Sequence, residues 1–149
     1  MSSAPKTILE ELLRHLGFQA VVEETDNEHG KLLSIQCEEA GRLIGRQGST
    51  LADLQYITNR MAFQRDPTAP KVTVDVGNYR GEAREALVRK AKEASAKARK
   101  LGDVVELGPL NASDRFVVHN ALKEEPDIST ESIEVDGTPD KVILVRLKR

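Results

Sequence analysis

Two glycines three residues apart, in the segment Gly45-Arg46-Gln47-Gly48, have the spacing in this chain that points most directly to chemistry. Glycines let a backbone turn sharply and leave no side chain between its amides and an approaching ligand. The helix expected after the segment would begin with free N–H groups and the positive end of its dipole. Such a loop suits a phosphodiester backbone, and Arg46, with Arg42 one turn earlier, would add charge attraction. The alternative is a helix connection that merely needs glycines, because a bare GxxG is common.

A second pair of side chains, Arg115 and His119, lies four residues apart in a segment expected to be helical. This spacing places both on one helix face, where together they could hold a phosphate or a sugar edge. The structural alternative is a salt-bridged arginine beside a capping or core histidine.

The residue types that support catalysis are present but are not arranged for it. No nucleophile elbow surrounds a serine, and the three histidines, His15, His29 and His119, lie in unlike contexts. Gly45 and Gly48 are too close for a phosphate-binding P-loop, and no Gly-Lys-Ser/Thr follows them. Cys37 alternates with apolar residues, which favours a buried structural thiol over a nucleophile. We therefore expect no catalysis, no cofactor and no metal site.

Composition limits the class of protein. With 149 residues, 39% hydrophobic and 31% charged, the chain fits one ordinary domain or two very small ones. Apolar runs fall far short of the roughly 20 residues that span a bilayer, and no signal segment opens the chain. A single cysteine excludes an internal disulfide and suits a reducing compartment, so we expect a cytoplasmic protein. Aromatic residues are only 3%; Tyr56 and Tyr79 could stack on bases, although helix packing is the favoured interpretation of Tyr56.

The net charge of −2 hides a strong local bias. Residues 78–101 carry 8 basic and 3 acidic side chains, whereas residues 102–140 carry 2 basic and 10 acidic ones. The middle of the chain is therefore a basic island, which is either a solvated helix face or a surface for a polyanion.

The elements that must position the glycine loop follow from hydrophobic periodicity. Helical spacing predicts a helix from about Pro5 to Gly17, and period-two alternation from Phe18 to Cys37 predicts a hairpin that turns at 27–30. Residues 39–44 and 49–64 are expected to be helices, and residues 72–76 a strand. One face of the helix at 49–64 is expected to be buried through Leu51, Leu54, Ile57 and Met61.

The second half of the chain begins with one long helix over residues 78–101. Its apolar stripe consists of Ala83, Leu87, Ala91, Ala94, Ala98 and Leu101. A short strand is expected at 104–107, and a helix near Asn111, whose spacing to Asp114 resembles a capping box. Two closing strands are predicted at 131–135 and 141–147.

The placement of the glycine loop favours its interpretation as a binding element. The loop is framed by Leu43-Ile44 and Leu51, and the elements around it follow the order helix, strand, strand, helix, helix, strand. With this loop in this order, residues 6–76 resemble a type II KH domain. The resemblance implies binding of RNA or single-stranded DNA, with Gly45, Arg46, Gln47 and Gly48 clamping the backbone and Arg42 nearby. Bases would lie along a groove between the helices and the sheet edge.

Residues 78–147 resemble an R-three-H domain, a single-stranded nucleic-acid binder named for its Arg-xxx-His spacing, here Arg115 and His119. Where many relatives have a tyrosine before the acidic residue, this chain reads Asn111-Ala112-Ser113-Asp114, so one stacking aromatic is missing. A binding site in this domain would be framed by the Arg-xxx-His pair, the basic helix and a cationic carboxy-terminal group of Lys141, Arg146, Lys148 and Arg149.

A type II KH domain followed directly by an R-three-H domain is the arrangement of the bacterial Jag, or SpoIIIJ-associated, family. Further matches are Leu54-Gln55-Tyr56, Asp75-Val76, Tyr79-Arg80, Val105-Glu106-Leu107 and Glu125-Pro126-Asp127. The resemblance implies a cytoplasmic RNA-binding protein linked to cell elongation, division or sporulation, which in some bacteria pairs with a small separate KH protein. Many relatives also carry an amino-terminal Jag domain, whereas this sequence is expected to begin at the KH helix.

The expected fold class is therefore α+β, with a type II KH domain (αββααβ, residues 1–77) and an R-three-H domain (αβαββ, residues 78–149) joined by the long basic helix. The expected function is recognition of single-stranded RNA by a post-transcriptional regulator or RNA chaperone. The alternative is a non-catalytic protein-interaction adaptor that retains both shapes, and affinity for short single-stranded RNA separates the two.

Overall fold

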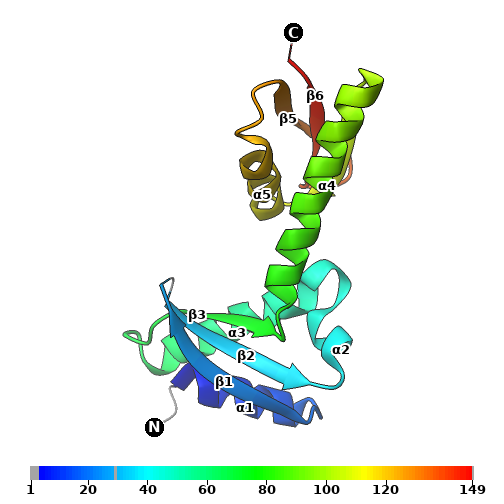
Figure 1. Ribbon diagram of the computed structural model, residues 1–149. Coiled ribbons are helices and arrows are strands. Elements are labelled where there is room, and N and C mark those ends of the chain that lie inside the picture. Colours follow the sequence, from blue (N-terminus) through cyan, green and yellow to red (C-terminus); the bar gives the residue numbers. More distant parts are fainter. Residues whose placement is uncertain (1–3, 29, 149) are drawn as a thin grey trace. The chain divides into compact units, whose positions relative to one another are not determined.

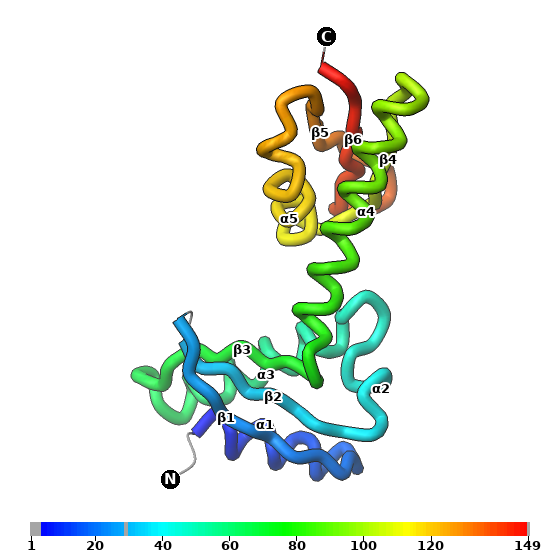
Figure 2. Tube along the Cα trace, in the orientation of Figure 1, coloured from blue at the N-terminus to red at the C-terminus, as the bar shows by residue number. Residues whose placement is uncertain are grey.

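The computed structural model describes residues 4–28 and 30–148 and divides the chain into two compact units, Met1–Arg80 and Gly81–Arg149 (Figures 1 and 2). Each unit combines helices with a three-stranded sheet, which confirms the expected α+β class. His29, in the predicted hairpin turn, and Arg149 lie outside the described residues.

The first unit has the predicted order αββααβ. Its elements are α1 (Ala4–His15), β1 (Ala20–Asn27), β2 (Gly30–Cys37), α2 (Ala40–Ile44), the 3-10 helix η1 (Arg46–Gly48), α3 (Ser49–Arg65) and β3 (Val72–Val76). Strand β1 pairs with β2 antiparallel, and β3 pairs with the other side of β2 in parallel. Because the order is β1-β2-β3, β3 is an edge strand, and one of its two sides has no strand partner.

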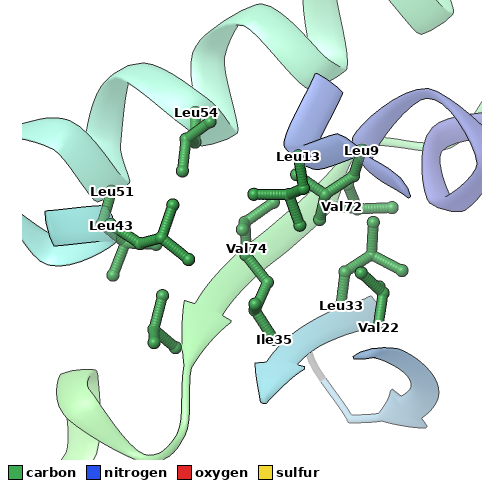
Figure 3. Close-up of a cluster of buried hydrophobic side chains, with 11 residues drawn as sticks. Leu9, Leu13, Val22, Leu33, Ile35, Leu43, Leu51, Leu54, Val72 and Val74 are labelled. Atoms are coloured by element: carbon green, nitrogen blue, oxygen red, sulfur yellow. The ribbon is translucent and has the colours of Figure 1, made fainter. Parts of the chain in front are cut away.

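The core of the first unit forms because strand alternation and helical stripes bring apolar side chains to one layer (Figure 3). It contains Leu9, Leu13, Val22, Leu33, Ile35, Leu43, Leu51, Leu54, Val72, Val74 and Val76. Fully burying each aliphatic side chain contributes about 1.5–3 kcal/mol. Both helices that flank the glycine loop supply core residues, so packing fixes the loop at both ends.

Helix α3 buries a different face from the one predicted. Leu51 and Leu54 are buried as expected, but Ile57 is 45% exposed, and Thr58 and Ala62 are buried in its place. Ile57 lies six residues after Leu51, which places it about 120° around the helix from Leu51. Thr58 lies seven residues after Leu51, nearly two full turns, and therefore returns to the same face. The prediction for Ile57 was wrong because it followed apolar residue type rather than the helical period.

The second unit has the predicted order αβαββ. It consists of α4 (Tyr79–Leu101, which begins in the last residues of the first unit), β4 (Val105–Leu110), α5 (Ala112–Leu122), β5 (Ile128–Glu134) and β6 (Lys141–Leu147). The sheet is antiparallel with the order β4-β6-β5. Its core contains Ala91, Ala94, Val118, Leu122, Ile128, Ile143 and Val145.

Three details of this unit differ from the sequence prediction, and one confirms it. Strand β4 spans Val105–Leu110 rather than 104–107. Strand β5 begins at Ile128 rather than residue 131, because Ile128 is itself a core residue. Leu101 was expected to continue the buried stripe of α4, but it is the last helical residue and 55% exposed. Asn111 caps α5 as expected, since its Oδ1 accepts a hydrogen bond from the Asp114 backbone N–H at 2.8 Å.

Across residues 4–28 and 30–148, no helix combines the length and the apolar character that crossing a membrane requires.

Candidate nucleic-acid interface

The loop between α2 and α3 is a single 3-10 turn that depends on left-handed backbone angles. Gly45 has φ 72°, Gln47 φ 54° and Gly48 φ 79°. A Cβ on Gly45 would collide with Thr50 Oγ1 and lie 2.9 Å from the Thr50 backbone nitrogen. A Cβ on Gly48 would lie 3.1 Å from Tyr79 Cε1. Both glycines are therefore required by packing inside the unit, whatever the loop binds.

The loop presents donors and charge outward. Helix α3 begins with no side-chain cap on its first turn, although the Ser49 N–H already donates to Arg46 O. Arg46 and Gln47 are exposed, and the Arg46 side chain makes no hydrogen bond or ion pair with any residue the structure describes. An uncapped helix start beside an unpaired guanidinium matches the chemistry of an approaching phosphate.

Arg42, the other cation predicted for this site, is already engaged. Its Nη1 donates to Glu39 Oε2 at 2.8 Å, and its guanidinium carbon lies 5.1 Å from the centre of the Phe18 ring. The side chain is still largely exposed. A phosphate at Arg42 would therefore compete with Glu39, whereas one at Arg46 would not.

The outer edge of β3 is covered by side chains rather than left open. Asn59 on α3 accepts from Val72 N–H at 2.8 Å and donates to Val72 O at 2.9 Å. Gln55 Oε1 accepts from Val74 N–H, and Arg80 Nε donates to Val74 O, both at 2.9 Å. Arg80 Nη2 also donates to Gln55 Oε1 at 2.9 Å. Because these side chains already bond the backbone N–H and C=O groups along the free edge of β3, a base that lies along this edge would contact the side chains before the backbone.

The sequence analysis did not assign Gln55 and Asn59 to the site. Their four-residue spacing on a helix is the signal that could have found them, since it aligns two amides on one face. Only the fold shows that this face lies along β3.

The two tyrosines take opposite roles. Tyr56 is 71% exposed on α3, so the favoured interpretation that it packs within the protein was wrong. Tyr79 is partly buried, packs against the core of the first unit and contacts the loop at Gly48. Tyr56 is therefore free to stack on a ligand, and Tyr79 supports the loop.

Arg115 and His119 lie on one face of α5 but have separate partners within the unit. Arg115 Nη1 donates to Leu110 O at 2.7 Å, which ties the start of α5 to the end of β4. His119 Nδ1 lies 2.7 Å from Thr130 Oγ1, and its Nε2 lies 3.1 Å from Ser132 Oγ, which ties α5 to β5. Both residues stabilise the unit, and the remaining donors of Arg115 can meet a ligand.

Two cations of the basic helix α4 are paired with the acidic segment after α5. Arg99 donates to both Asp127 oxygens at 2.7 and 2.8 Å and to Glu125 Oε1 at 2.7 Å. Hydrogen bonds from Arg99 lower the pKa of Asp127. Burial would raise the pKa of Glu125, but hydrogen bonds from Arg99 and Ser95, with Lys92 nearby, hold it below its ordinary value. Lys92 and Arg99 therefore act within the unit.

One member of the cationic carboxy-terminal group, Arg146, does not lie on the side of the sheet that His119 contacts. Arg146 pairs with Glu131 at 2.7 Å. Glu131 alternates with Thr130 and Ser132 along β5, so this pair lies on the sheet face opposite to His119. Arg149, part of the same predicted frame, lies outside the described residues.

Cys37 and the acidic and histidine side chains are the groups that a thiol or metal site would need. Cys37 is half-buried and packs against the core of the first unit. Within the described part of the chain, no group of three or more His, Cys, Asp or Glu side chains is placed to hold a metal ion.

Comparisons with known proteins agree with this geometry. Residues 6–76 match the family described as KhpA/KhpB, KH domain. The chain is 30% identical over 129 residues to the RNA-binding protein KhpB of Clostridium symbiosum, covering 86% of this chain and 57% of that relative. It is 36% identical over 86 residues to RNA-binding protein KhpB of Bacillus subtilis, covering 57% of this chain and 41% of that relative.

A third relative, RNA-binding protein KhpB of Lactiplantibacillus plantarum, is 23% identical over 138 residues, which cover 93% of this chain and 42% of the relative. The matched region thus spans about half the length of these relatives. The family match includes the loop Gly45–Gly48 and its flanking helices, and the relatives extend the similarity into the second unit. Residues 6–76 therefore match the KhpA/KhpB KH-domain family, and the chain along most of its length is similar to the KhpB (Jag) proteins.

Proposed function

We propose that this chain binds single-stranded RNA, holding the sugar-phosphate backbone at the loop Gly45–Gly48. The observation that carries the proposal is the uncapped start of α3 beside the exposed, unpaired Arg46, in a fold matched to the KhpA/KhpB KH domain. Open N–H groups and a free guanidinium attract phosphate without reading sequence. Single-stranded DNA offers the same backbone charge, and its affinity relative to RNA measures the contribution of the 2′-hydroxyl.

Arg46→Glu is expected to weaken binding of a labelled single-stranded RNA octamer by at least about tenfold at low salt, because it replaces attraction by repulsion at the phosphate. The slope of log affinity against log salt should become shallower by about 0.7, the value for one phosphate contact. Fluorescence anisotropy across a salt series measures both quantities.

The matched control is Arg65→Glu, which changes the net charge equally at the far end of α3. It should leave the octamer affinity within about twofold of wild type. Equal losses for the two variants would show that net charge, not the loop, governs binding, and would favour the adaptor alternative.

We propose a second RNA contact at the Arg115 and His119 face of α5, with residues 1–77 as the KH domain and 78–149 as the R-three-H domain. A shared phosphate would couple the two side chains. In a double-mutant cycle with Arg115→Gln and His119→Gln, the double variant should therefore lose less affinity than the two single variants together.

The cycle needs a folding control, because both side chains also hold α5 in place. Amide hydrogen exchange of α5 and β5 measures that contribution. If the losses of RNA affinity in the single variants simply add, Arg115 and His119 do not share a phosphate. If the affinity falls in proportion to the loss of amide protection, their role is purely structural.

The family match suggests the setting of this activity. We propose a bacterial post-transcriptional regulator or RNA chaperone linked to cell elongation, division or sporulation, which pairs with a small separate KH protein. Crosslinking of bound RNA in cells, followed by sequencing, would identify the targets. Recovery of proteins but no RNA would favour the interaction adaptor.

A further inference from the structure

Among the described residues, the outer edge of strand β1 has no strand beside it. In the order β1-β2-β3, β1 pairs only with β2, and Figure 1 shows it at the margin of the sheet. The other margin, β3, is five residues long and is covered by side chains of α3 and by Arg80. Strand β1 has eight residues and contains no proline. A long edge strand offers backbone N–H and C=O groups to another extended chain.

The side chains along this edge are open to solvent, and the surrounding hairpin is acidic. Alternation places Val21, Glu23 and Thr25 on one face of the strand, and all three are exposed. Residues 17–39 carry six acidic side chains and one lysine. Glu23 makes no ion pair with any residue in the described ranges. This edge therefore repels phosphate and attracts cations.

A pocket of about 670 Å³ continues the edge where β1 begins and β2 ends. Its polar lining comes from Gln19, Gln36, Glu38 and Glu39, and no lysine or arginine of the described chain lines it. Gln36 lies opposite Val21 in the β1–β2 ladder, so the pocket and the exposed face of β1 are continuous. Glu39 is paired with Arg42, whereas Glu38 is exposed and has no ion-pair partner within the described part of the chain. Amide and carboxylate oxygens together suit the donors of a guanidinium or ammonium group.

We propose that this edge binds an extended segment of a partner protein, which adds a strand to β1 and places an arginine or lysine side chain in the pocket. The backbone of β1 would supply the pairing, and Glu23 and Glu38 would supply the charge complementarity. A second copy of β1 does not fit, because its acidic residues would lie against those of the first. The same charges repel RNA, so this surface is separate from the RNA contacts proposed above and does not depend on them.

The test uses a labelled peptide of about ten residues that alternates arginine with threonine, titrated with the full chain at low salt and followed by fluorescence anisotropy. We expect saturable binding. A peptide that alternates glutamate with threonine should bind at least about tenfold more weakly, because its charge is reversed.

Two N-methylated forms of the arginine peptide separate strand pairing from simple charge attraction. One is blocked at the arginine N–H groups and the other at the threonine N–H groups, and both keep the charge. In an added strand only alternate N–H groups face β1. The form that blocks those groups should lose at least about fivefold in affinity, and the other should bind like the parent peptide.

On the protein, Glu23→Gln together with Glu38→Gln should weaken binding of the arginine peptide about tenfold, because exposed charge pairs contribute up to about fivefold each. The matched control is Asp53→Asn together with Asp103→Asn, which changes the net charge equally at exposed carboxylates outside the hairpin. It should keep the affinity within about twofold of wild type.

Amide hydrogen exchange locates the bound peptide. Because alternate N–H groups of β1 point away from β2, every second amide of the strand should exchange more slowly in the complex. Amides of β3, at the covered edge, should not change.

Protection of alternate β1 amides, with unequal affinities for the two N-methylated peptides, supports the docking edge. Equal affinities for those two peptides overturn it, and so do equal affinities of the two protein variants, because the peptide then binds through net charge alone. Absence of peptide binding by the wild-type chain overturns it as well. These experiments contain no RNA, so none of these outcomes bears on the proposed RNA binding.

Discussion

Gly45→Ala is expected to destabilise the first unit by about 3 kcal/mol, the largest effect of a single methyl group that we predict in this chain. Left-handed backbone at a non-glycine residue costs about 1–2 kcal/mol, and Gly45 has φ 72°. The new Cβ would also collide with Thr50 Oγ1 and lie 2.9 Å from the Thr50 backbone nitrogen. Overpacking of this kind costs about 1–3 kcal/mol. Shortening Thr50 cannot relieve the backbone contact.

Urea unfolding followed by tyrosine fluorescence measures this loss in the first unit alone. The chain has no tryptophan, and both tyrosines lie within residues 1–80. Gly41→Ala is the matched control, because Gly41 lies inside α2 and a Cβ there meets nothing within 4 Å. Alanine at Gly41 should stabilise the unit by up to about 1 kcal/mol. Similar midpoints for the two variants would contradict the geometry described for the loop.

The same packing affects how loop variants are interpreted. A side chain at Gly48 would press on Tyr79, so Gly48→Asp perturbs the first unit as well as any bound phosphate. The Arg46 side chain is exposed and has no partner among the described residues, so its substitution leaves the packing intact. Arg46→Glu is therefore the variant that tests binding, and Gly45→Ala the variant that tests the fold.

The helices and strands could be predicted because local periodicity and turn residues determine them. Strand β6 has the predicted bounds, 141–147, since a continuous apolar run from Val142 to Val145 follows a turn that contains Gly137 and Pro139. The cap of α5 at Asn111 was predictable for the same reason, because it depends on residues three positions apart.

Contacts between distant residues could not be predicted in this way. Asn59 binds the backbone of Val72 across 13 positions, and Arg99 binds Asp127 across 28. No local pattern marks such pairs, because they depend on how the elements pack. The exposure of Tyr56 is of the same kind, since it follows from which face of α3 meets the sheet. The sequence therefore identified the glycine loop but not the two amides, Gln55 and Asn59, that lie along β3.

The basic island shows most clearly how tertiary contacts change a charge argument. Residues 78–101 carry eight basic side chains, but Arg80, Lys92 and Arg99 make hydrogen bonds or ion pairs within the protein. The other five, all exposed, make no ion pair with any residue in the described ranges: Arg84, Arg89, Lys90, Lys97 and Lys100. Only these five remain available to neutralise phosphates.

Neutralising three of these free cations, with Arg84→Gln, Arg89→Gln and Lys90→Gln together, is expected to make the salt dependence of RNA binding much shallower. Each phosphate contact to a single strand contributes about 0.7 to the slope of log affinity against log salt, so losing three should lower the slope by about 2. The ratio of wild-type to variant affinity should then fall about 100-fold over a tenfold increase in salt. Anisotropy titrations with an RNA of about 12 nucleotides measure this ratio.

A second triple variant, Arg14→Gln, Lys31→Gln and Arg65→Gln, provides the matched control because it changes the net charge equally in the first unit. Lys31 and Arg65 are already within 4 Å of carboxylates, and Arg14 lies in the last turn of α1. Its slope should stay near that of wild type, because these cations are not expected to contact phosphate. If both triple variants gave the wild-type slope, the free cations of α4 would be a solvated helix face, and the phosphate contacts would lie at the glycine loop or at the Arg115 and His119 face instead.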